Sequence, residues 1–389
     1  MSPMSRRLLR AACVPLAVAA GFGAGVVTGV VGTGGSEAEA PSAGVIDEAA
    51  ARISAGASRS VDREELERAA VEGMLRALGD RWSAYYDPAE FAAFSESVEG
   101  RYSGVGVWLR PDPRGVVVGS VQPGSPAARA GVLAGERVRR IAGSPVRSVD
   151  DAVRLLREES TRGPVELRLT GGRGDRAVRL VRESIQTSDV EVEPLPGWMV
   201  RIAVAGFSRG VGRDVREALN EHAAASGRGV VLDLRGNPGG LLTEAVEVAS
   251  AFLRGGPVVR YERRAAPPRT FEALGDGDTR TPVVVLVDGR TASAAEVVAA
   301  ALQDRNRAVV VGAPTFGKGS VQEPTRLSDG SAIELTVGRY LTPAGRDIDG
   351  VGVTPDVLVS DAQPPAVALD RARDVLVGLL AALPTSGRG

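Results

Sequence analysis

Lys318 is the chemically unusual residue of this chain, because it is the one lysine among 47 lysine and arginine residues. GC-rich codon usage explains the many arginines but does not explain one retained lysine. Arginine cannot lose its proton in a protein, whereas a buried lysine can become a neutral amine. We therefore expect Lys318 to act as an amine base. The one histidine, His222, lies in an Ala-rich helical pattern and is expected at the surface, so it is a poor candidate base.

Ser293 is the candidate nucleophile. It falls in the first turn of an Ala-rich helical pattern that follows a buried strand, where unpaired amides and the helix dipole create a positive potential. Thr291 is the better placed residue to cap this helix, which leaves the Ser293 hydroxyl available. Glu296 lies one turn further on. Its charge would keep a neighbouring lysine protonated unless the carboxyl group is turned away, neutral or bonded elsewhere.

Lys318 emerges from a valine-rich strand pattern over 309–312 into backbone flanked by glycines. Apolar neighbours such as Phe316 would lower the pKa of the lysine by desolvation, and Gln322 can accept a hydrogen bond from the amine without adding charge. The string from Gly317 to Ser320 resembles a fragment of a phosphate-binding loop. A glycine follows the lysine, however, and the chain beyond it is predicted to be extended, so we reject nucleotide binding.

A third crossing, Asp233–Gly240, joins a buried strand to a helix through the sequence DLRGNPGG. Backbone amides that point outward at the start of a helix can bind an anion or an oxyanion. The Asn-Pro-Gly-Gly string alone is also typical of an ordinary turn, so this loop gains weight only from the two loops described above.

Two resemblances to known families rest on these motifs. GSPAARAG, residues 124–131, followed by GERV, residues 135–138, resembles a bacterial PDZ domain, in which Glu136 stands where the family usually has Asp. TASAAE, residues 291–296, and PTFGKGSVQ, residues 314–322, resemble the carboxyl-terminal processing peptidases, serine proteases with a serine-lysine dyad. RYLTPAGR and GVTPD, further downstream, support the second resemblance, which covers residues from about 64 to 359.

The peptidase resemblance implies proteolysis of extracytoplasmic proteins near their carboxyl termini, with Ser293 as nucleophile, Lys318 as base and Gln322 as the residue that orients the lysine. It also implies that Glu296 supports the site and that the oxyanion is bound by backbone amides of Ala294, Gly239 and Gly240. The PDZ resemblance implies that a loop binds the free carboxyl terminus of the substrate beside an added strand. The residues of this loop are Gly104, Val105, Gly106 and Val107.

The elements that must position these residues alternate between strands and helices after residue 185, with valine runs typical of strands buried on both faces. We expect an α/β protein: a layered parallel-sheet peptidase core with an inserted β-rich PDZ domain and a helical amino-terminal cap. The expected divisions are a membrane anchor or signal peptide (1–36), a linker (37–60), the helical cap (61–101), the PDZ domain (102–184), the α/β core (185–360) and a carboxyl-terminal helix (361–389).

Composition and the amino terminus limit the partners. The net charge is -1, which argues against binding of nucleic acid, and the single cysteine, Cys13, excludes an internal disulfide and a thiolate metal site. We expect no cofactor and no metal. Three arginines precede an uncharged stretch, residues 11–36, that is long enough to span a bilayer. We expect a single-pass anchor with the rest of the chain on the extracytoplasmic face, or a secreted protein if the segment is cleaved.

Two other functions remain open at this point. The PDZ segment could bind peptides while the α/β segment is inert, although the intact set of Ser293, Lys318 and Gln322 argues against an inactive scaffold. An acyl-thioester enzyme would need a pocket for a nucleotide-type cofactor, and no basic cluster in the sequence suits one.

Overall fold

The computed structural model describes residues 44–157, 163–172, 174–186, 188–223, 229–264 and 266–382. The chain divides into two compact units: the first comprises the described residues up to Phe91 and from Asp189 onward, and the second is Ala92–Ser188. The expected membrane segment, residues 1–36, lies outside the described residues. Within those residues, no helix has the length and apolarity that a bilayer span requires.

The first unit contains a six-stranded sheet in the order β10-β11-β12-β15-β16-β19. β10 pairs antiparallel with β11, and the other neighbouring strands pair in parallel. β12 and β15 are buried along their whole length, which matches their valine-rich sequences. The strands are β10 (Val190–Leu195), β11 (Met199–Val204), β12 (Gly229–Asp233), β15 (Val283–Val287), β16 (Val309–Gly312) and β19 (Val357–Leu358).

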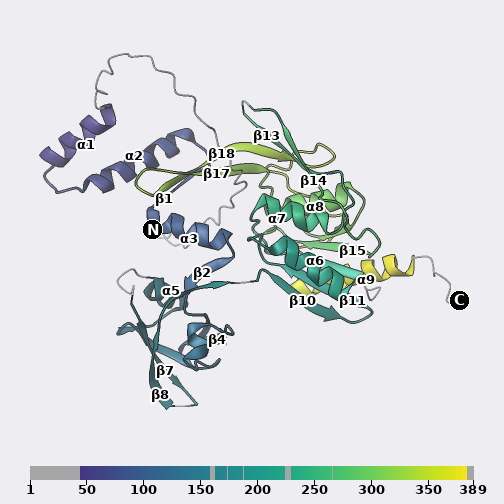
Figure 1. Ribbon diagram of the computed structural model, residues 1–389, viewed down its shortest axis with the longest axis horizontal. Coiled ribbons are helices and arrows are strands. Elements are labelled where there is room, and N and C mark those ends of the chain that lie inside the picture. Colours follow the sequence, from purple (N-terminus) through teal and green to yellow (C-terminus); the bar gives the residue numbers. More distant parts are fainter. Residues whose placement is uncertain are drawn as a thin grey trace, which may run out of the picture. The chain divides into compact units, whose positions relative to one another are not determined.

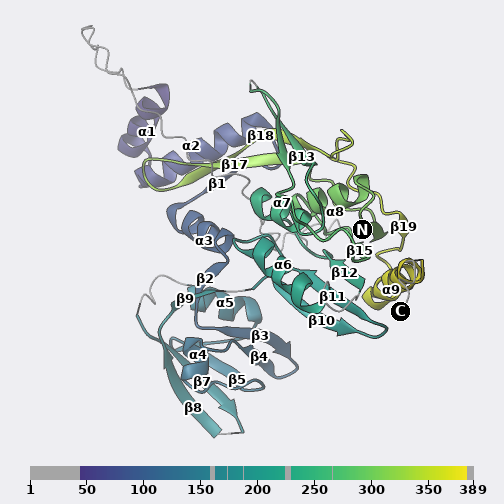
Figure 2. The same cartoon turned by 45° about the vertical axis from the view of Figure 1, so that its right-hand side comes forward.

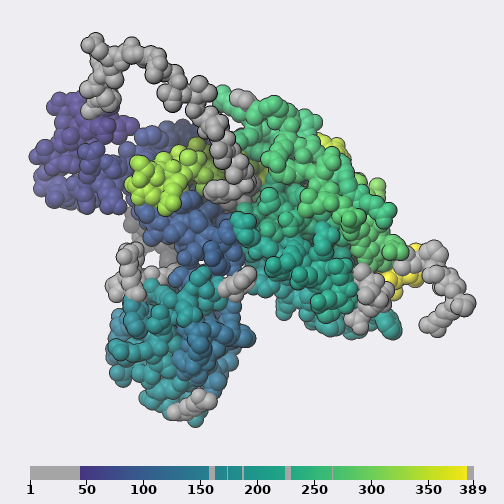
Figure 3. Space-filling view, viewed as in Figure 1, coloured from purple at the N-terminus to yellow at the C-terminus, as the bar shows by residue number. Residues whose placement is uncertain are grey.

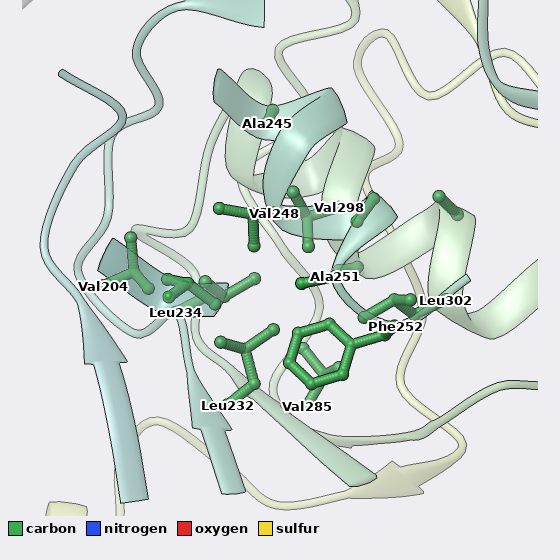
Figure 4. Close-up of a cluster of buried hydrophobic side chains, with 14 of the residues drawn as sticks. Val204, Leu232, Leu234, Ala245, Val248, Ala251, Phe252, Val285, Val298 and Leu302 are labelled. Atoms are coloured by element: carbon green, nitrogen blue, oxygen red, sulfur yellow. The ribbon is translucent and has the colours of Figure 1, made fainter. Parts of the chain in front are cut away.

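Helices pack on both faces of this sheet (Figure 1). Leu232 and Val285 point into a cluster formed with α6, α7 and α8, part of which is drawn in Figure 4. Their neighbours Val231 and Val284 point the other way and pack with Leu376 of α9. This alternation explains why both faces of the strands are apolar. The helices are α6 (Val211–His222), α7 (Leu242–Ser250), α8 (Ala294–Asp304) and α9 (Pro365–Ala381), and α9 falls in the range predicted as a carboxyl-terminal helix.

A second sheet of the first unit joins segments far apart in the sequence. Its order is β1-β18-β13-β14, and β17 also pairs with β18. β1 runs antiparallel to β18 and places Ala84 opposite Glu334. Figures 2 and 3 show the lime-green hairpin of β17 and β18 beside the blue segment that contains β1. The strands are β1 (Ala84–Tyr86), β13 (Pro257–Arg263), β14 (Arg269–Glu272), β17 (Ser320–Arg326) and β18 (Ala332–Leu341).

The amino-terminal segment differs from its expected form in two places. The range predicted as a helical cap, 61–101, contains α2 (Arg63–Leu78) and α3 (Pro88–Val98), but β1 lies between them. Its tyrosines favour an extended conformation, and β18 supplies the hydrogen-bonding partner. The range predicted as a linker contains the helix α1 (Val45–Gly56).

The second unit is rich in strands. Its larger sheet has the order β3-β4-β5-β7-β8, with β6 paired to β5, and β2 pairs separately with β9. α4 begins where Ser125 accepts a hydrogen bond from the Ala128 N–H and Pro126 occupies the first turn. The elements are β2 (Arg101–Gly104), β3 (Val107–Asp112), β4 (Gly115–Val121), α4 (Pro126–Arg129), β5 (Arg137–Ile141), β6 (Ser144–Pro145), α5 (Val149–Arg157), β7 (Val165–Gly171), β8 (Gly174–Leu180) and β9 (Glu183–Gln186).

Candidate active site

Three loops meet where the central parallel strands of the first unit end. They follow β12, β15 and β16, which are neighbours in the sheet, so their carboxyl ends share one edge. Backbone hydrogen bonds join the loops: the Ala292 N–H donates to the Asn237 oxygen at 2.9 Å, and the Phe316 N–H donates to the Thr291 oxygen at 2.9 Å. The topology therefore brings together the three loops that the sequence analysis singled out, which contain Gly239 and Gly240, Ser293, and Lys318.

Ser293 lies in a strained turn between β15 and α8. Its φ is 56° and its ψ is -119°, an uncommon conformation for a residue with a side chain, and only 4% of its surface is exposed. The sequence-based prediction that Thr291 caps the helix is wrong. Ser293 is the N-cap residue, while the Thr291 hydroxyl bonds to the Leu234 oxygen and to Asp288. Thr291 thereby fastens the nucleophile loop to the loop after β12.

Glu296 explains how a buried carboxylate can lie beside a lysine. Oε2 accepts the backbone N–H groups of both Ser293 and Lys318, each at 2.8 Å. Oε1 accepts the Gly317 N–H at 2.8 Å and the Thr315 hydroxyl. Burial raises the pKa of Glu296, and these four donors lower it. The carboxyl group is thus bonded elsewhere, one of the three options left open by the sequence, and it ties the candidate nucleophile and base together through their backbones.

In a capping box, the serine oxygen accepts an N–H group while the glutamate at the third helical position accepts the serine N–H. Ser293 and Glu296 occupy the two positions of this motif. The glutamate half of the motif is the bond from the Ser293 N–H to Glu296 Oε2 at 2.8 Å, and among the described residues no hydrogen bond involves the Ser293 hydroxyl, which is therefore available to a base.

Lys318 is buried, with 5% of its surface exposed, and its Nζ lies 4.8 Å from the centre of the Trp82 ring. Burial lowers the pKa of Lys318, and the charges of Glu334, Asp80 and Glu296 oppose that shift. No hydrogen bond joins Nζ to Ser293 in the described part of the chain. The lysine is therefore desolvated as expected but rests on an aromatic ring.

The Gln322 side-chain amide is held by β17 and β18. Gln322 is 1% exposed, and its Nε2 donates to Ser320 Oγ at 3.0 Å and to Thr336 Oγ1 at 3.1 Å. Among the described residues, no hydrogen bond joins it to Lys318. Because both donors of the amide are occupied, its oxygen is oriented as the remaining acceptor.

The amides predicted to bind an oxyanion are not equivalent. The Gly239 N–H donates to Asn237 Oδ1 at 2.8 Å and is therefore occupied. The N–H groups of Gly240 and Ala294 donate to no other described residue. Gly239 still has a steric role: its φ is +110°, and a Cβ there would lie 2.9 Å from the Cβ of Ser293. The loop after β12 must be glycine at this point to approach the nucleophile.

Four functional candidates escaped the sequence analysis: Thr315, Trp82, Tyr86 and Glu334. Thr315 lies inside a recognised motif, but only the hydrogen bond to Glu296 reveals its role. Trp82 and Tyr86 belong to a segment predicted to be helical. Glu334 sits on the buried face of β18, where strict alternation in the strand could have singled out a charged residue at an inward position.

The loop predicted to bind carboxylates connects β2 to β3 in the second unit. Val105 is 3% exposed and packs in the core, and its oxygen accepts the Ala127 N–H at 2.9 Å. Gly106 has a φ of +78°, and a Cβ there would lie 2.1 Å from the Cβ of Ser125. β3, which follows this loop, pairs only with β4 among the described strands, so its other edge can accept an added strand.

Comparisons with known proteins agree with both motifs. Residues 199–359 match peptidase family S41, and residues 117–170 match the PDZ domain family. The carboxy-terminal-processing protease of Bartonella bacilliformis is 34% identical over 78% of this chain and 71% of its own length. A solved photosystem II D1 C-terminal processing protease is 32% identical with a TM-score of 0.51, over 84% of this chain and 90% of that one.

The chain therefore belongs to the carboxyl-terminal processing peptidases of family S41. It is 35% identical to carboxyl-terminal-processing peptidase 3 of Arabidopsis thaliana over 74% of this chain, and 31% identical to the processing protease CtpA of Bacillus subtilis over 77%. It spans 59% of the length of the first and 65% of the length of the second.

Proposed function

We propose that the chain is a serine endopeptidase that cleaves proteins near their carboxyl termini, with Ser293 as nucleophile and Lys318 as general base. The observation that carries the proposal is the Glu296 carboxylate, which accepts a backbone N–H from each of these two residues inside a buried site. Family membership supports it. In architectural terms we propose a layered parallel-sheet core with an inserted PDZ domain and an amino-terminal cap in which β1 interrupts the helices.

In the reaction that we propose, Nζ of neutral Lys318 accepts the Ser293 hydroxyl proton as Oγ attacks the scissile carbonyl carbon. The N–H groups of Ala294 and Gly240 bind the oxyanion, helped by the positive end of α8. The resulting ammonium then gives its proton to the leaving amine. The neutral amine then deprotonates a water molecule that attacks the acyl-enzyme carbonyl carbon, and the ammonium returns this proton to Ser293 Oγ as the ester bond breaks.

The supporting residues have distinct tasks in this scheme. Glu296 and Thr315 hold the backbones of the nucleophile and base loops in register, and they touch no reacting atom. When Lys318 moves off the Trp82 ring to act as the base, Gln322 presents its amide oxygen to the amine. This oxygen is neutral, so it orients the amine without raising its pKa.

We propose further that the PDZ domain captures the free carboxyl terminus of the substrate. The amides near Gly106 would bind the carboxylate, and the open edge of β3 would pair with the last residues of the peptide. This arrangement would deliver a segment just upstream of the terminus for cleavage. It agrees with the names of the relatives, which describe processing at the carboxyl terminus.

For localisation we propose the extracytoplasmic face of the membrane, through a single-pass anchor, or secretion if the amino-terminal segment is cleaved. The support is the arginine cluster followed by an uncharged stretch over residues 11–36.

The decisive experiment uses the scarcity of lysine and cysteine. Lys318→Arg keeps the charge but cannot give a free amine, so it should lose activity as fully as Lys318→Ala, on the order of 10⁴-fold in kcat/KM. In a Cys13→Ser chain, Lys318→Cys carries the only thiol. Alkylation with bromoethylamine then rebuilds a lysine-like amine at that one position.

Peptidase activity on a fluorogenic peptide should return on alkylation and stay absent when Ser293→Ala is added. Robust activity in Lys318→Arg, or recovery in the double mutant, would refute the dyad. Complete inactivity of the wild-type chain with intact peptide binding would favour the scaffold, and activity that requires coenzyme A would favour the thioester enzyme.

A further inference from the structure

Glu334 is a buried glutamate whose charge is only partly compensated. Its residue surface is 0% exposed, and Tyr86 donates its hydroxyl to Oε2 at 2.9 Å. Oε1 is buried without a hydrogen-bond partner. Leaving a buried carboxylate oxygen unpaired is costly, so such a group calls for an explanation. Burial raises the pKa of Glu334 to about 7, against the opposing effects of Tyr86 and Lys318.

The Lys318 amine is the complementary group. Its three N–H donors make no hydrogen bond to any other described residue, and the Trp82 ring beneath it offers only a π face. Trp82 belongs to a turn that is joined to β18, because Ser83 Oγ accepts the Thr336 N–H at 3.4 Å. Thr336 lies two residues from Glu334, on the same face of the strand.

Three carboxylates raise the pKa of Lys318, and two of them are already committed to other donors. Asp80, from the turn before β1, accepts the Trp82 N–H and the Ser83 hydroxyl. Glu296, from α8, accepts four donors. Only Glu334, which has the largest effect of the three, keeps an oxygen without a hydrogen bond.

Arg81 and Glu90 are the other charged groups near this cluster. The Arg81 guanidinium lies 4.7 Å from the centre of the Trp82 ring, whereas Glu90, whose Oε2 accepts the Asp87 N–H, acts on Tyr86. Arginine stays charged at every pH at which the enzyme is folded, so its effect on the lysine is constant. Glu334 therefore remains as the group whose ionisation changes the charge around Lys318, and Tyr86 is hydrogen-bonded to Glu334.

We propose that Glu334 is the internal counter-ion of Lys318: its open carboxylate oxygen stabilises the ammonium form of the lysine, and this sets both the pH at which the base becomes neutral and its strength. Glu334 acts as a positioning residue that touches no substrate. The inference rests on the proposed function, because it assigns a control element to the same base.

Two opposite effects on catalysis follow. The carboxylate makes the ammonium harder to deprotonate, so it moves the acid limb of the pH profile to higher pH. It also makes the neutral amine a stronger base and stabilises the ammonium formed when Ser293 loses its proton, so it raises the rate on the alkaline plateau. A proton lost from Lys318 before the reaction goes to the solvent.

Glu334→Gln should therefore shift the acid limb of kcat/KM to lower pH by about 1 unit and lower the plateau rate severalfold. Tyr86→Phe should shift the acid limb in the same direction by a smaller amount. Loss of the Tyr86 hydrogen bond raises the pKa of Glu334, so less of the carboxylate is ionised beside the lysine. The matched control is Glu323→Gln on β17, because Glu323 bonds to Tyr261 and Arg263 and not to the lysine. A purely structural role would lower the plateau without moving the limb.

The single lysine allows a direct readout that does not need peptidase activity. Full-length protein labelled with ¹³C at lysine Cε gives one lysine signal, whose pH titration reports the pKa of Lys318. We expect Glu334→Gln to lower that pKa by about 1 unit and Glu323→Gln to leave it unchanged. If the Lys318 titration is unchanged in Glu334→Gln, the counter-ion proposal is wrong. If that variant does not fold, the same titration in Tyr86→Phe tests the proposal. An inactive wild type, or an active Lys318→Ala, overturns the dyad instead.

Discussion

Glu136 in the PDZ domain and Glu296 and Glu334 in the peptidase unit are all buried glutamates, but their carboxylates have different partners. The Arg176 guanidinium binds both oxygens of Glu136 at 2.9 and 2.8 Å, and the Leu133 N–H adds a third donor. Glu296 is bound by uncharged donors alone, and Glu334 by one hydroxyl. An arginine thus neutralises the Glu136 charge in the PDZ domain, whereas no arginine among the described residues pairs with Glu296 or Glu334.

The partners of a buried carboxylate indicate whether it stabilises the fold or acts on a reactive site. A glutamate paired with an arginine in fork geometry acts as a fixed crosslink. A buried glutamate whose hydrogen-bond donors are uncharged acts electrostatically on the groups around it, and here these groups include the candidate nucleophile and base. Glu136, which stands where PDZ domains usually have Asp, therefore stabilises the fold through Arg176.

We expect the largest loss of reactivity when Glu296, which joins the Ser293 loop to the Lys318 loop, is replaced. Glu296→Gln offers an N–H₂ group where four donors require acceptors, so the Ser293 and Lys318 backbones should move apart. We expect the rate at which a fluorophosphonate labels Ser293 to fall about 10²-fold. Glu136→Gln is the matched control: it should destabilise the PDZ domain, measured by urea unfolding, and leave the labelling rate as it was. Equal losses in both variants would erase the distinction drawn above.

A smaller effect is expected in the PDZ domain, where the proposed ligand is a substrate carboxylate. Amidation of the carboxyl terminus of a model peptide should lower kcat/KM about 10-fold, because an ionised terminus loses its hydrogen bonds to the loop amides. Gly106→Ala should abolish this preference, since its Cβ would collide with Ser125. Gly124→Ala, which has a φ of +71° and open space around the Cβ, is the control that should keep it. If free and amidated peptides are cut equally well by the wild type, the capture mechanism is wrong.

The smallest effect concerns stability. Burial places the pKa of Lys318 below its ordinary value of 10.5, so the folded state disfavours the ammonium. The penalty is fully present below the folded-state pKa and disappears as the pH rises toward 10.5, where the unfolded chain also loses the proton. Lys318→Met should therefore raise the free energy of unfolding at pH 7 by about 0.5–2 kcal/mol while abolishing activity. A gain that stays constant up to pH 10.5 would show that packing, not charge, is responsible.

Local patterns were sufficient to predict most elements around the site. The valine-rich patterns predict buried strands where β15 and β16 lie, and the Ala-rich pattern that starts at Ser293 predicts the helix α8. These features depend on short-range preferences: β-branched residues favour buried strands, and Ala-rich segments favour helices. The composition alone made Lys318 conspicuous. The cap was predicted less well, because the tendency of β1 to be extended is realised only through pairing with β18.

The contacts within the site were decided by the tertiary structure. Four donors from two stretches of the chain converge on Glu296, and nothing in the spacing of the motifs says whether that carboxylate faces the lysine or the backbone. The same holds for Trp82, whose ring lies beneath the Lys318 amine next to the pairing of β1 with β18, and for Glu334, which the hairpin of β17 and β18 buries. Sequence patterns record periodicity along one element, whereas the pKa of a buried amine depends on every charge and dipole that surrounds it in space. The sequence by itself therefore determined which residues could react, and the packing of distant segments determined the electrostatic environment in which they do so.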